Sequence, residues 1–526
     1  MVDTGLKEAL LSGIGAEAAA LKGLSPADVP CINLPPLRFA EAARLVHAAG
    51  GRLVSEWAVD ETAFKKGFAV YACYAKGPEY LLVNSRLSEV NPTFPSITRK
   101  FTSAFRFERK INCLMGVTPS GHPDLRPWIL HEDWPKAVYP LRKSFNAKSF
   151  VPRVDGRYAW IQAAGEEVHE IPVGPVHAGI IEPGHFRFQA AGEDIINLEA
   201  RLGYVHKGIE KRFEAMSFKD GVRLAARVSG DSTVAHSTAY AMAIEALSGI
   251  TAPPRAMWLR GIMLELERLA NHLGDIGAIC NDTAFSFMLY QFSRLREYVL
   301  RACKEVFGHR LMMDTVVAGG VCFDIDRADA ALILKTLDTI STEFERLIAI
   351  YDDNPSLEDR LYTTGRLSRD AAKDLGAVGF VARASGVLLD VRLERPFPPY
   401  DVVKPLPIVL NSGDVHARAW VRVMETRDSI RMLRDMLEGL PEGPVSAEFD
   451  PHIQPYEAGF SSVEGWRGEI IYWVQSGPDN GINRCMVRDP SFVNWLCVEQ
   501  AIKGNIVPDF PLCNKSFNQS YSGNDL

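Results

Sequence analysis

The sequence contains no pair of cysteines spaced as Cys-x-x-Cys, although it has nine cysteines in 526 residues. That spacing is common in sites for zinc and for iron–sulfur clusters, whereas the cysteines here are scattered and odd in number. We therefore interpret them as single buried thiols in a reducing compartment, and we expect no metal and no iron–sulfur cluster bound by this chain alone. The nine are Cys31, Cys73, Cys113, Cys280, Cys303, Cys322, Cys485, Cys497 and Cys513.

Long apolar runs and an excess of basic residues are also missing. No uninterrupted stretch of about 18 apolar residues occurs, so we predict no transmembrane helix. The first residues include acidic side chains and lack a basic segment followed by a cleavage site, which argues against a secretory signal. With 58 basic and 65 acidic residues the formal charge is −7. We therefore expect no nucleic-acid partner.

What is present is the composition of a globular protein of more than one domain. Apolar residues make up 47% and charged residues 23% of a chain that is long enough for two cores. Residues 1–150 are interpreted as an α+β domain, with a helix-like stretch at 39–49 and strand-like alternation at 67–84. Residues 151–171 are polar and irregular and are predicted to be a linker. Residues 172–526 form the second domain.

The second domain is predicted to be mainly helical with small β-sheets, which makes the fold class α+β. A β-hairpin is expected where 186–188 and 195–198 flank a polar turn. Helical periodicity continues through 285–307 and 328–351. Between the hairpin and these stretches, apolar residues recur every three or four positions, as on the buried stripe of a helix. This stripe consists of Ile262, Leu266, Leu269, Leu273 and Ile276.

Four ordered motifs occur in the first domain. They are Phe107-Glu108-Arg109, Gly121-His122-Pro123-Asp124-Leu125-Arg126, Glu132-Asp133-Trp134 and Pro140-Leu141-Arg142-Lys143. Together they resemble the C-type subunit of complex I. In that family this subunit is a docking module without a cofactor, so the resemblance implies assembly rather than chemistry. A dense mixture of Arg, Asp, Trp and Pro also suits an ordered interface.

Six ordered motifs occur in the second domain. They are Gly174-Pro175-Val176-His177, Ile181-Glu182-Pro183-Gly184-His185, Tyr204-Val205-His206-Lys207-Gly208, Arg383-Ala384-Ser385-Gly386, Arg467-Gly468-Glu469 and Arg488-Asp489-Pro490-Ser491-Phe492. With these motifs the domain is similar to the D-type subunit of complex I and to the large subunit of group 4 nickel–iron hydrogenases of the formate hydrogenlyase and hydrogenase-4 type. The resemblance implies a fusion of the two modules.

In these hydrogenases two Cys-x-x-Cys pairs supply the thiolates that hold nickel and iron, and this chain departs from both pairs. The positions of the first pair, before Ala235-His236, are Ser229 and Ser232. The positions of the second pair, after Asp489-Pro490, are Ser491 and Asn494. Hydroxyl and amide groups are hard donors, whereas nickel in such a site is held by soft thiolates. We expect these ligand positions to hold no metal.

Several polar residues near those positions could still carry chemistry. Glu182 stands where hydrogenases place a proton-passing glutamate, although a salt bridge or strand-end cap explains it equally well. Asp231 lies within the altered loop and could pair with Arg383 or take a proton. We name Glu182 and Asp231 as candidate catalytic residues. His177 and His185 lie on the loop that reaches the quinone in the D-type subunit of complex I, so they are the candidate quinone-binding residues.

Arg383 has an alternative role in an internal ion-pair network with Asp390 and Arg392, and this interpretation is favoured.

Three functions fit the resemblance. The first is a nickel-free subunit of a complex I-like oxidoreductase at the cytoplasmic side of the inner membrane, peripheral to it. Electrons would pass from a 4Fe-4S cluster in a small partner subunit to a quinone or similar acceptor, with coupling to ion translocation. The second is a non-catalytic subunit that joins the iron–sulfur subunit to the membrane arm, and the third is an active hydrogenase. Expected partners are the small iron–sulfur subunit, a ferredoxin-like subunit, and membrane proteins similar to the antiporter-like and H-type subunits of complex I.

Overall fold

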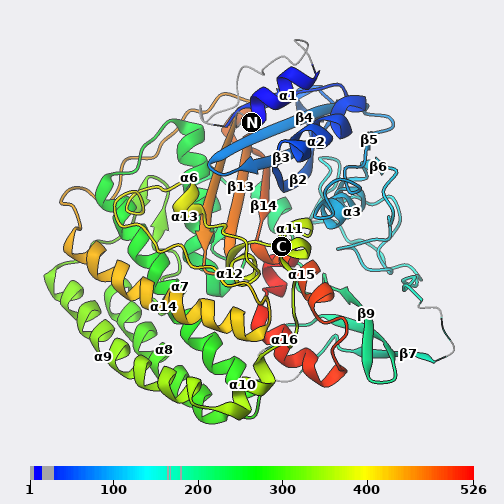
Figure 1. Cartoon of the computed structure of the whole chain (residues 1–526). Coiled ribbons are helices and arrows are strands. Elements are labelled where there is room, and N and C mark those ends of the chain that lie inside the picture. Colours follow the sequence, from blue (N-terminus) through cyan, green and yellow to red (C-terminus); the bar gives the residue numbers. More distant parts are fainter. Residues whose placement is uncertain (1–4, 15–28, 163–164, 166, 178–180) are drawn as a thin grey trace.

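The structure is a computed structural model that describes residues 5–14, 29–162, 165, 167–177 and 181–526. Figure 1 shows a sheet domain at the N-terminal end of the chain beside a larger part made of helices and small sheets. This arrangement confirms the α+β fold class. None of the helices in the described ranges combines the length and the apolar character that crossing a bilayer requires.

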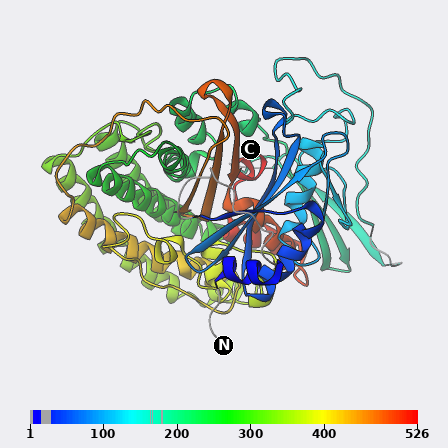
Figure 2. The same ribbon diagram turned by 90° about the horizontal axis from the view of Figure 1, so that it is seen from above.

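The N-terminal domain is built on one four-stranded sheet of order β1-β4-β3-β2. The strand-like stretch predicted at 67–84 is a hairpin of two long antiparallel strands, and the helix predicted at 39–49 is α2. Helices α1, α2 and α3 pack on one face of the sheet (Figure 2). The bounds are α1 Leu6–Ile14, β1 Cys31–Asn33, α2 Phe39–Ala48, β2 Arg52–Asp60, β3 Phe68–Lys76, β4 Glu79–Leu87, β5 Thr93–Pro95, α3 Ala104–Met115 and β6 Thr118–Ser120.

The other face of this sheet packs against a sheet of the second domain. Trp57 stacks on Tyr71 with ring centroids 5.5 Å apart, and Trp473 lies 5.4 Å from Trp57. These rings share one buried cluster with apolar residues from both sheets. The two domains are therefore joined by a common apolar core. The second sheet has the order β12-β13-β14, with bounds Ala458–Gly465, Gly468–Ser476 and Ile482–Arg488.

The predicted hairpin of the second domain is part of a three-stranded antiparallel sheet, β7-β8-β9. Residues 168–171, the end of the predicted linker, already belong to its first strand. The preceding residues 151–162 have no regular structure, yet Tyr158 donates a hydrogen bond of 3.1 Å to Glu199. The segment is thus attached to the second domain. The strand bounds are Val168–Val173, His185–Ala191 and Asp194–Arg201.

Long helices form the rest of the core. Helix α7 (Pro254–Asp282) contacts α8 (Ser286–Phe307) and α14 (Val415–Glu438), and α8 contacts α9 (Arg327–Asp352). All five residues of the predicted apolar stripe on α7 are buried. The periodicity of the sequence therefore located this bundle correctly.

Shorter elements connect the bundle to the sheets. They are α4 Ile209–Phe213, α5 Phe218–Ala225, α6 Thr233–Ser248, β10 Val316–Val317, β11 Gly320–Val321, α10 Pro355–Leu361, α11 Arg369–Asp374, α12 Gly379–Ala384, α13 Val391–Glu394, α15 Pro490–Ala501, α16 Phe510–Phe517 and α17 Tyr521–Asp525.

Candidate functional site

The loop that carries Ser229 and Ser232 makes one 3-10 turn before α6 and is closed by its own hydrogen bonds. The Ser229 hydroxyl lies 2.8 Å from Asp231 Oδ1 and 2.9 Å from the hydroxyl of Ser520. The Ser232 hydroxyl donates to the same Asp231 oxygen at 3.3 Å. Both serines are buried, so their oxygens are engaged with protein groups and not with solvent.

The second pair of positions lies at the start of α15, and Asp489 caps this helix by accepting from the Ser491 backbone N–H at 2.7 Å. The Ser491 hydroxyl accepts from the Ser520 backbone N–H at 2.9 Å. Asn494 is bonded elsewhere, to the backbone of Val378. The fold thus brings Ser229 and Ser491 together, with Ser520 as the bridge between them.

Arg467, from the β12–β13 turn, is the cation of this site. Its guanidinium nitrogens lie 2.6 and 2.7 Å from the two carboxylate oxygens of Asp231. The Arg467 side chain is 4% exposed and that of Asp231 33%. Burial would raise the pKa of Asp231, but Arg467 outweighs it and lowers this pKa to about 2. Asp231 is therefore ionised at neutral pH and cannot act there as a proton donor.

Arg383, which was one predicted alternative for the partner of Asp231, is bonded elsewhere. Arg383 donates to Glu425 at 2.8 Å and to Glu464 at 2.9 Å, and it lies 3.5 Å from Asp390. The favoured alternative, an internal ion-pair network, is confirmed, because Arg392 also lies 2.7 Å from Asp390. Arg467 belongs to a motif quoted from the sequence, but nothing local linked it to Asp231.

The donor set at the four positions does not fit a nickel–iron group. It consists of three hydroxyls and one amide, and each already has a protein partner. The cavity beside Asp231 and Glu267 has a volume of about 10 Å³, which is at the lower limit for one water molecule. Across the described ranges no cluster of three or more His, Cys, Asp or Glu could hold a metal ion. Soft thiolate ligands are missing at every position that the resemblance assigns to them.

Glu182 approaches the serine loop through Ser522. Its carboxylate accepts from the Ser522 backbone N–H at 3.1 Å, and the Ser522 hydroxyl donates to Val228 O at 2.8 Å. Lys207 donates to the same Val228 oxygen at 3.0 Å. Two hydrogen bonds of Ser522 therefore link Glu182 to Val228, the residue before Ser229. The role of Ser522 was missed, because only the fold brings it to Glu182.

The two candidate histidines fix the ends of the β7–β8 connection. His177 Nε2 donates to Gly184 O at 2.7 Å, and His185 Nδ1 donates to Gly174 O at 3.3 Å. His185 is 8% exposed, and its Nε2 atom has no partner in the described part of the chain. Burial lowers the pKa of His185, so the ring is neutral at pH 7 and Nε2 is a free acceptor. The structure does not bring either histidine into contact with the serine loop.

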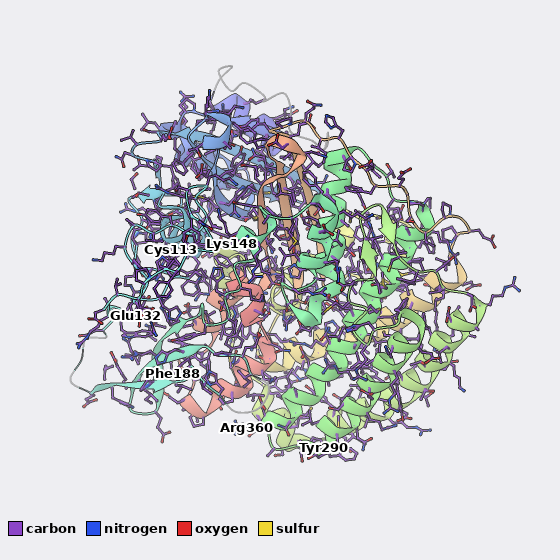
Figure 3. The ribbon with its side chains drawn as sticks, turned by 180° about the vertical axis from the view of Figure 1, so that it is seen from behind. Cys113, Glu132, Lys148, Phe188, Tyr290 and Arg360 are labelled. Carbon is purple, nitrogen blue, oxygen red and sulfur yellow. The ribbon has the colours of Figure 1, made fainter. Side chains whose placement is uncertain are left out.

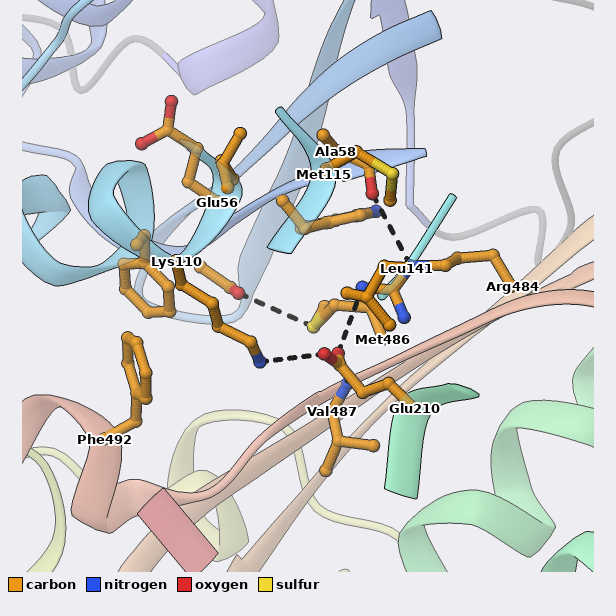
Figure 4. Close-up of a pocket in the computed structure, with 14 residues that line it drawn as sticks. Glu56, Ala58, Lys110, Met115, Leu141, Glu210, Arg484, Met486, Val487 and Phe492 are labelled. Atoms are coloured by element: carbon orange, nitrogen blue, oxygen red, sulfur yellow. Dashed lines mark hydrogen bonds and ion pairs between the residues drawn. The ribbon is translucent and has the colours of Figure 1, made fainter. Parts of the chain in front are cut away.

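A small cavity lies between the two domains and is lined by residues of both (Figure 4). Lys110 lies 2.9 Å and Arg484 3.1 Å from the buried carboxylate of Glu210. The Glu56 carboxyl points away from this group, and neither of its oxygens has a partner among the described residues. Burial raises the pKa of Glu56 well above its ordinary value, and the nearby charge of Glu108 raises it further. With a volume of about 20 Å³ the cavity holds about one water and no substrate.

Comparisons with known proteins agree with this architecture. The family model of the respiratory-chain NADH dehydrogenase 30 Kd subunit matches residues 32–151, and that of the 49 Kd subunit matches residues 281–458. A chain of the membrane-bound sulfane sulfur reductase, an archaeal respiratory membrane complex, has the same fold. The TM-score is 0.65 at 24% identity, and the match covers 69% of this chain and 100% of that chain.

Two Escherichia coli (strain K12) proteins are similar over most of the sequence. Formate hydrogenlyase subunit 5 is 33% identical over 490 residues, which are 91% of this chain and 86% of that protein. Hydrogenase-4 component G is 33% identical over 478 residues, which are 89% of this chain and 82% of that protein. The chain therefore belongs to the family of fused complex I 30-kDa/49-kDa proteins that includes these formate hydrogenlyase and hydrogenase-4 subunits.

Proposed function

We propose that this chain is the hydrogenase-like subunit of a complex I-like oxidoreductase that works without nickel and iron. The observation that carries the proposal is the donor set of Ser229, Ser232, Ser491 and Asn494, in which every side chain is bonded to protein groups. A soft metal pair would require thiolates at these positions. Metal analysis of the purified complex tests this directly. We expect nickel far below one equivalent and no hydrogen evolution, and stoichiometric nickel would contradict the proposal.

The proposed reaction is electron transfer from a 4Fe-4S cluster in a small partner subunit to a quinone or similar acceptor, coupled to ion translocation. The space beside Asp231 is about 10 Å³, which is too small for a quinone ring. We therefore assign the acceptor to the surroundings of His185, whose buried Nε2 atom has no partner among the described residues. In its neutral form this nitrogen carries no proton, because Nδ1–H is bonded to Gly174 O. It would therefore hold the quinol product by accepting a hydrogen bond from one of its hydroxyls, and the two protons that the reduction consumes would come from water.

Quinone-dependent turnover of the complex in the variant His185→Ala tests this assignment. We expect turnover to fall by about tenfold, the scale of one lost hydrogen bond to the bound quinol. His452→Ala provides the control, because His452 is an exposed loop residue. His177→Ala should lower turnover less, because His177 is tied to Gly184. Equal turnover in the two variants His185→Ala and His452→Ala would remove His185 from the reaction.

A second function is favoured by the filled space between Ser229 and Ser491. In this alternative the chain is a structural and coupling subunit that joins the iron–sulfur subunit to the membrane arm, and the electrons do not reach an acceptor on it. It predicts that His185→Ala and Glu182→Gln both leave turnover unchanged. It also predicts that variants which loosen the domain interface release the partners. An active nickel–iron hydrogenase is the least supported function.

The proposed partners are a small iron–sulfur subunit, a ferredoxin-like subunit, and membrane proteins similar to the antiporter-like and H-type subunits of complex I. The proposed location is the cytoplasmic side of the inner membrane, as a peripheral subunit. Support comes from the relatives, since one of them is a formate hydrogenlyase subunit and the similar solved chain is part of a respiratory membrane complex. Affinity purification from detergent-solubilised membranes should recover the complex. Recovery of the chain alone would contradict this assembly.

A further inference from the structure

The described part of the chain contains a larger cleft, far roomier than the two cavities above and unrelated to the proposed reaction. Its volume is about 400 Å³, within the usual range for a small-molecule site. The cleft lies where the segment after α10 meets the segment after α15. The side chains that matter for its chemistry are Thr363, Thr364, Arg366, Lys503, Asn505 and Asp509.

The walls of this cleft are held in place by hydrogen bonds between segments far apart in sequence. The Gly365 backbone N–H donates to Asn505 Oδ1 at 2.9 Å, and Arg418 donates to Gly365 O at 2.9 Å. Gly365 has a φ of +59°, and a Cβ atom there would lie 2.5 Å from Cys513 Sγ. The glycine therefore allows the two walls to approach closely. The Ile195 backbone N–H donates a hydrogen bond of 2.9 Å to Asn505 O and so holds this residue in place.

The cleft carries an uncompensated positive charge. Its one carboxylate, Asp509, is paired with Arg360 at 3.1 Å. Arg366 and Lys503 are exposed, and in the described ranges neither side chain has a hydrogen bond or an ion pair. The whole chain has a net charge of −7, yet two cations without partners line this cleft. This local positive charge favours an anionic ligand.

The end of a helix works against an anion, because its last carbonyls carry partial negative charge. At α15 these carbonyls are covered. The Asn505 amide nitrogen lies 3.3 Å from Ala501 O, 3.2 Å from Ile502 O and 3.3 Å from Lys503 O. The neutral Asn505 amide thus satisfies these carbonyls, which reduces the repulsion between the helix end and an anion in the cleft.

We propose that this cleft binds a phosphate group, held by Arg366 and Lys503 with the Thr363 hydroxyl as a further donor. A guanidinium presents two parallel N–H groups that match two phosphate oxygens, and a lysine ammonium adds a point charge to a third. A carboxylate has only two oxygens and would leave one of these donors unused. The phosphate can belong to a soluble phosphate ester or to the head group of an anionic lipid.

The position of the cleft separates it from the candidate site. Helix α15 spans Pro490–Ala501, so its last residue is about 15 Å from Ser491 near its start. Arg360, beside the cleft, and Tyr290 lie at the same end of the molecule (Figure 3). Substitutions in the cleft therefore leave Ser491 and the groups bonded to it unchanged.

Titration calorimetry of the full chain with inorganic phosphate is the first test. We expect saturable binding by the natural protein and a loss of about tenfold or more in affinity in the double variant Arg366→Ala/Lys503→Ala. The control is Lys335→Ala/Arg346→Ala, which removes the same charge from exposed positions on α9 and should bind as the natural protein does. Absence of saturable binding, or equal affinity in the natural protein and the cleft variant, would overturn the proposal.

Co-sedimentation with phosphatidylcholine vesicles, with and without phosphatidylglycerol, identifies the source of the phosphate. If the cleft variant loses both phosphate binding and binding to the anionic vesicles, the ligand is a lipid head group. If it loses phosphate binding while vesicle binding is unchanged or absent throughout, the ligand is a soluble phosphate ester. Either result supports a phosphate site, and circular dichroism of the variant checks that it is folded.

Discussion

Arg467 and Asp231 form a two-point ion pair, in which guanidinium nitrogens lie 2.6 and 2.7 Å from the two carboxylate oxygens. The same arginine donates to Asn518 O at 2.7 Å, and its guanidinium lies over the Trp466 ring at 3.9 Å. These contacts link the serine loop to the β12–β13 turn and to the C-terminal helices. A charge-assisted network thus stands where the hydrogenase relatives are expected to have thiolates.

Replacing Arg467 by alanine should destabilise the protein, because Asp231 would lose its partner while staying partly buried. We expect the free energy of unfolding to fall by about 2–3 kcal/mol, less than for a fully buried pair because a third of the Asp231 side chain meets solvent. Denaturant unfolding measures the change. Arg301→Ala, which breaks an exposed pair with Glu297, is the control and should cost less than about 1 kcal/mol. Equal losses would show that the Arg467 pair behaves as a surface pair.

Ser520 should contribute more to the free energy of unfolding than a serine that only caps a helix. Its hydroxyl bonds Ser229 at 2.9 Å and also accepts from the Gly523 N–H at the start of α17. Ser217 is the control. It caps α5 by accepting a hydrogen bond from the Asp220 N–H, but it does not bridge to the serine loop as Ser520 does. Ser520→Ala should therefore cost about 2–3 kcal/mol and Ser217→Ala about 1 kcal/mol. Similar melting temperatures for the two variants would argue against a bridge that stabilises the site.

Acid should weaken the domain interface through Glu469, which lies between Arg52 and Arg488. Burial would raise the pKa of Glu469, but the two arginines hold it at about 2, below the value of about 4.3 for a free glutamate. Because the folded-state pKa is the lower one, the stabilisation is complete above about pH 4.3 and is lost as the pH falls toward 2.

The variant Glu469→Gln should therefore lose about 3 kcal/mol of unfolding free energy at pH 7, and the loss should shrink as the pH falls from about 4.3 to about 2. Glu297 is the matched control, since exposed arginines also lower its pKa to about 2. Glu297→Gln should cost less than about 1 kcal/mol at any pH. A pH-independent loss in Glu469→Gln would contradict the ionic origin of the effect.

The apolar stripe on α7 makes a simpler prediction. Leu269 is fully buried between the long helices, so Leu269→Ala should leave a cavity and cost about 3 kcal/mol. Leu388 is 49% exposed, and Leu388→Ala should change the unfolding free energy by about 0.5 kcal/mol or less. Thermal unfolding of the two variants checks the contrast, and equal midpoints would contradict the assignment of the helix core.

The sequence predicted the elements whose signal is local. The periodicity on α7, the hairpin before it and the ion-pair network around Arg383 are all present. Pairings between distant segments were not predicted. Arg467 lies 236 residues after Asp231, and no spacing rule links the two.

Ser520 and Ser522 escaped notice for the same reason, because a serine in a tail has no distinctive pattern until the fold places it beside a loop or a carboxylate. The free nitrogen of His185 also depends on burial, which a single sequence does not reveal. The residue types of the site were therefore accessible from the sequence, whereas their partners required the three-dimensional arrangement.

The contact of Trp57 and Tyr71 with Trp473 has a consequence for how the protein is supplied to its complex. Separating the two domains would bare aromatic surface on both sheets, and such surface promotes aggregation in water. Because both domains are encoded in one chain, they are synthesised in equal amounts. Neither domain is then left without its counterpart and with its aromatic surface exposed. The aromatic interface creates the risk of aggregation, and joining both domains in one chain reduces it.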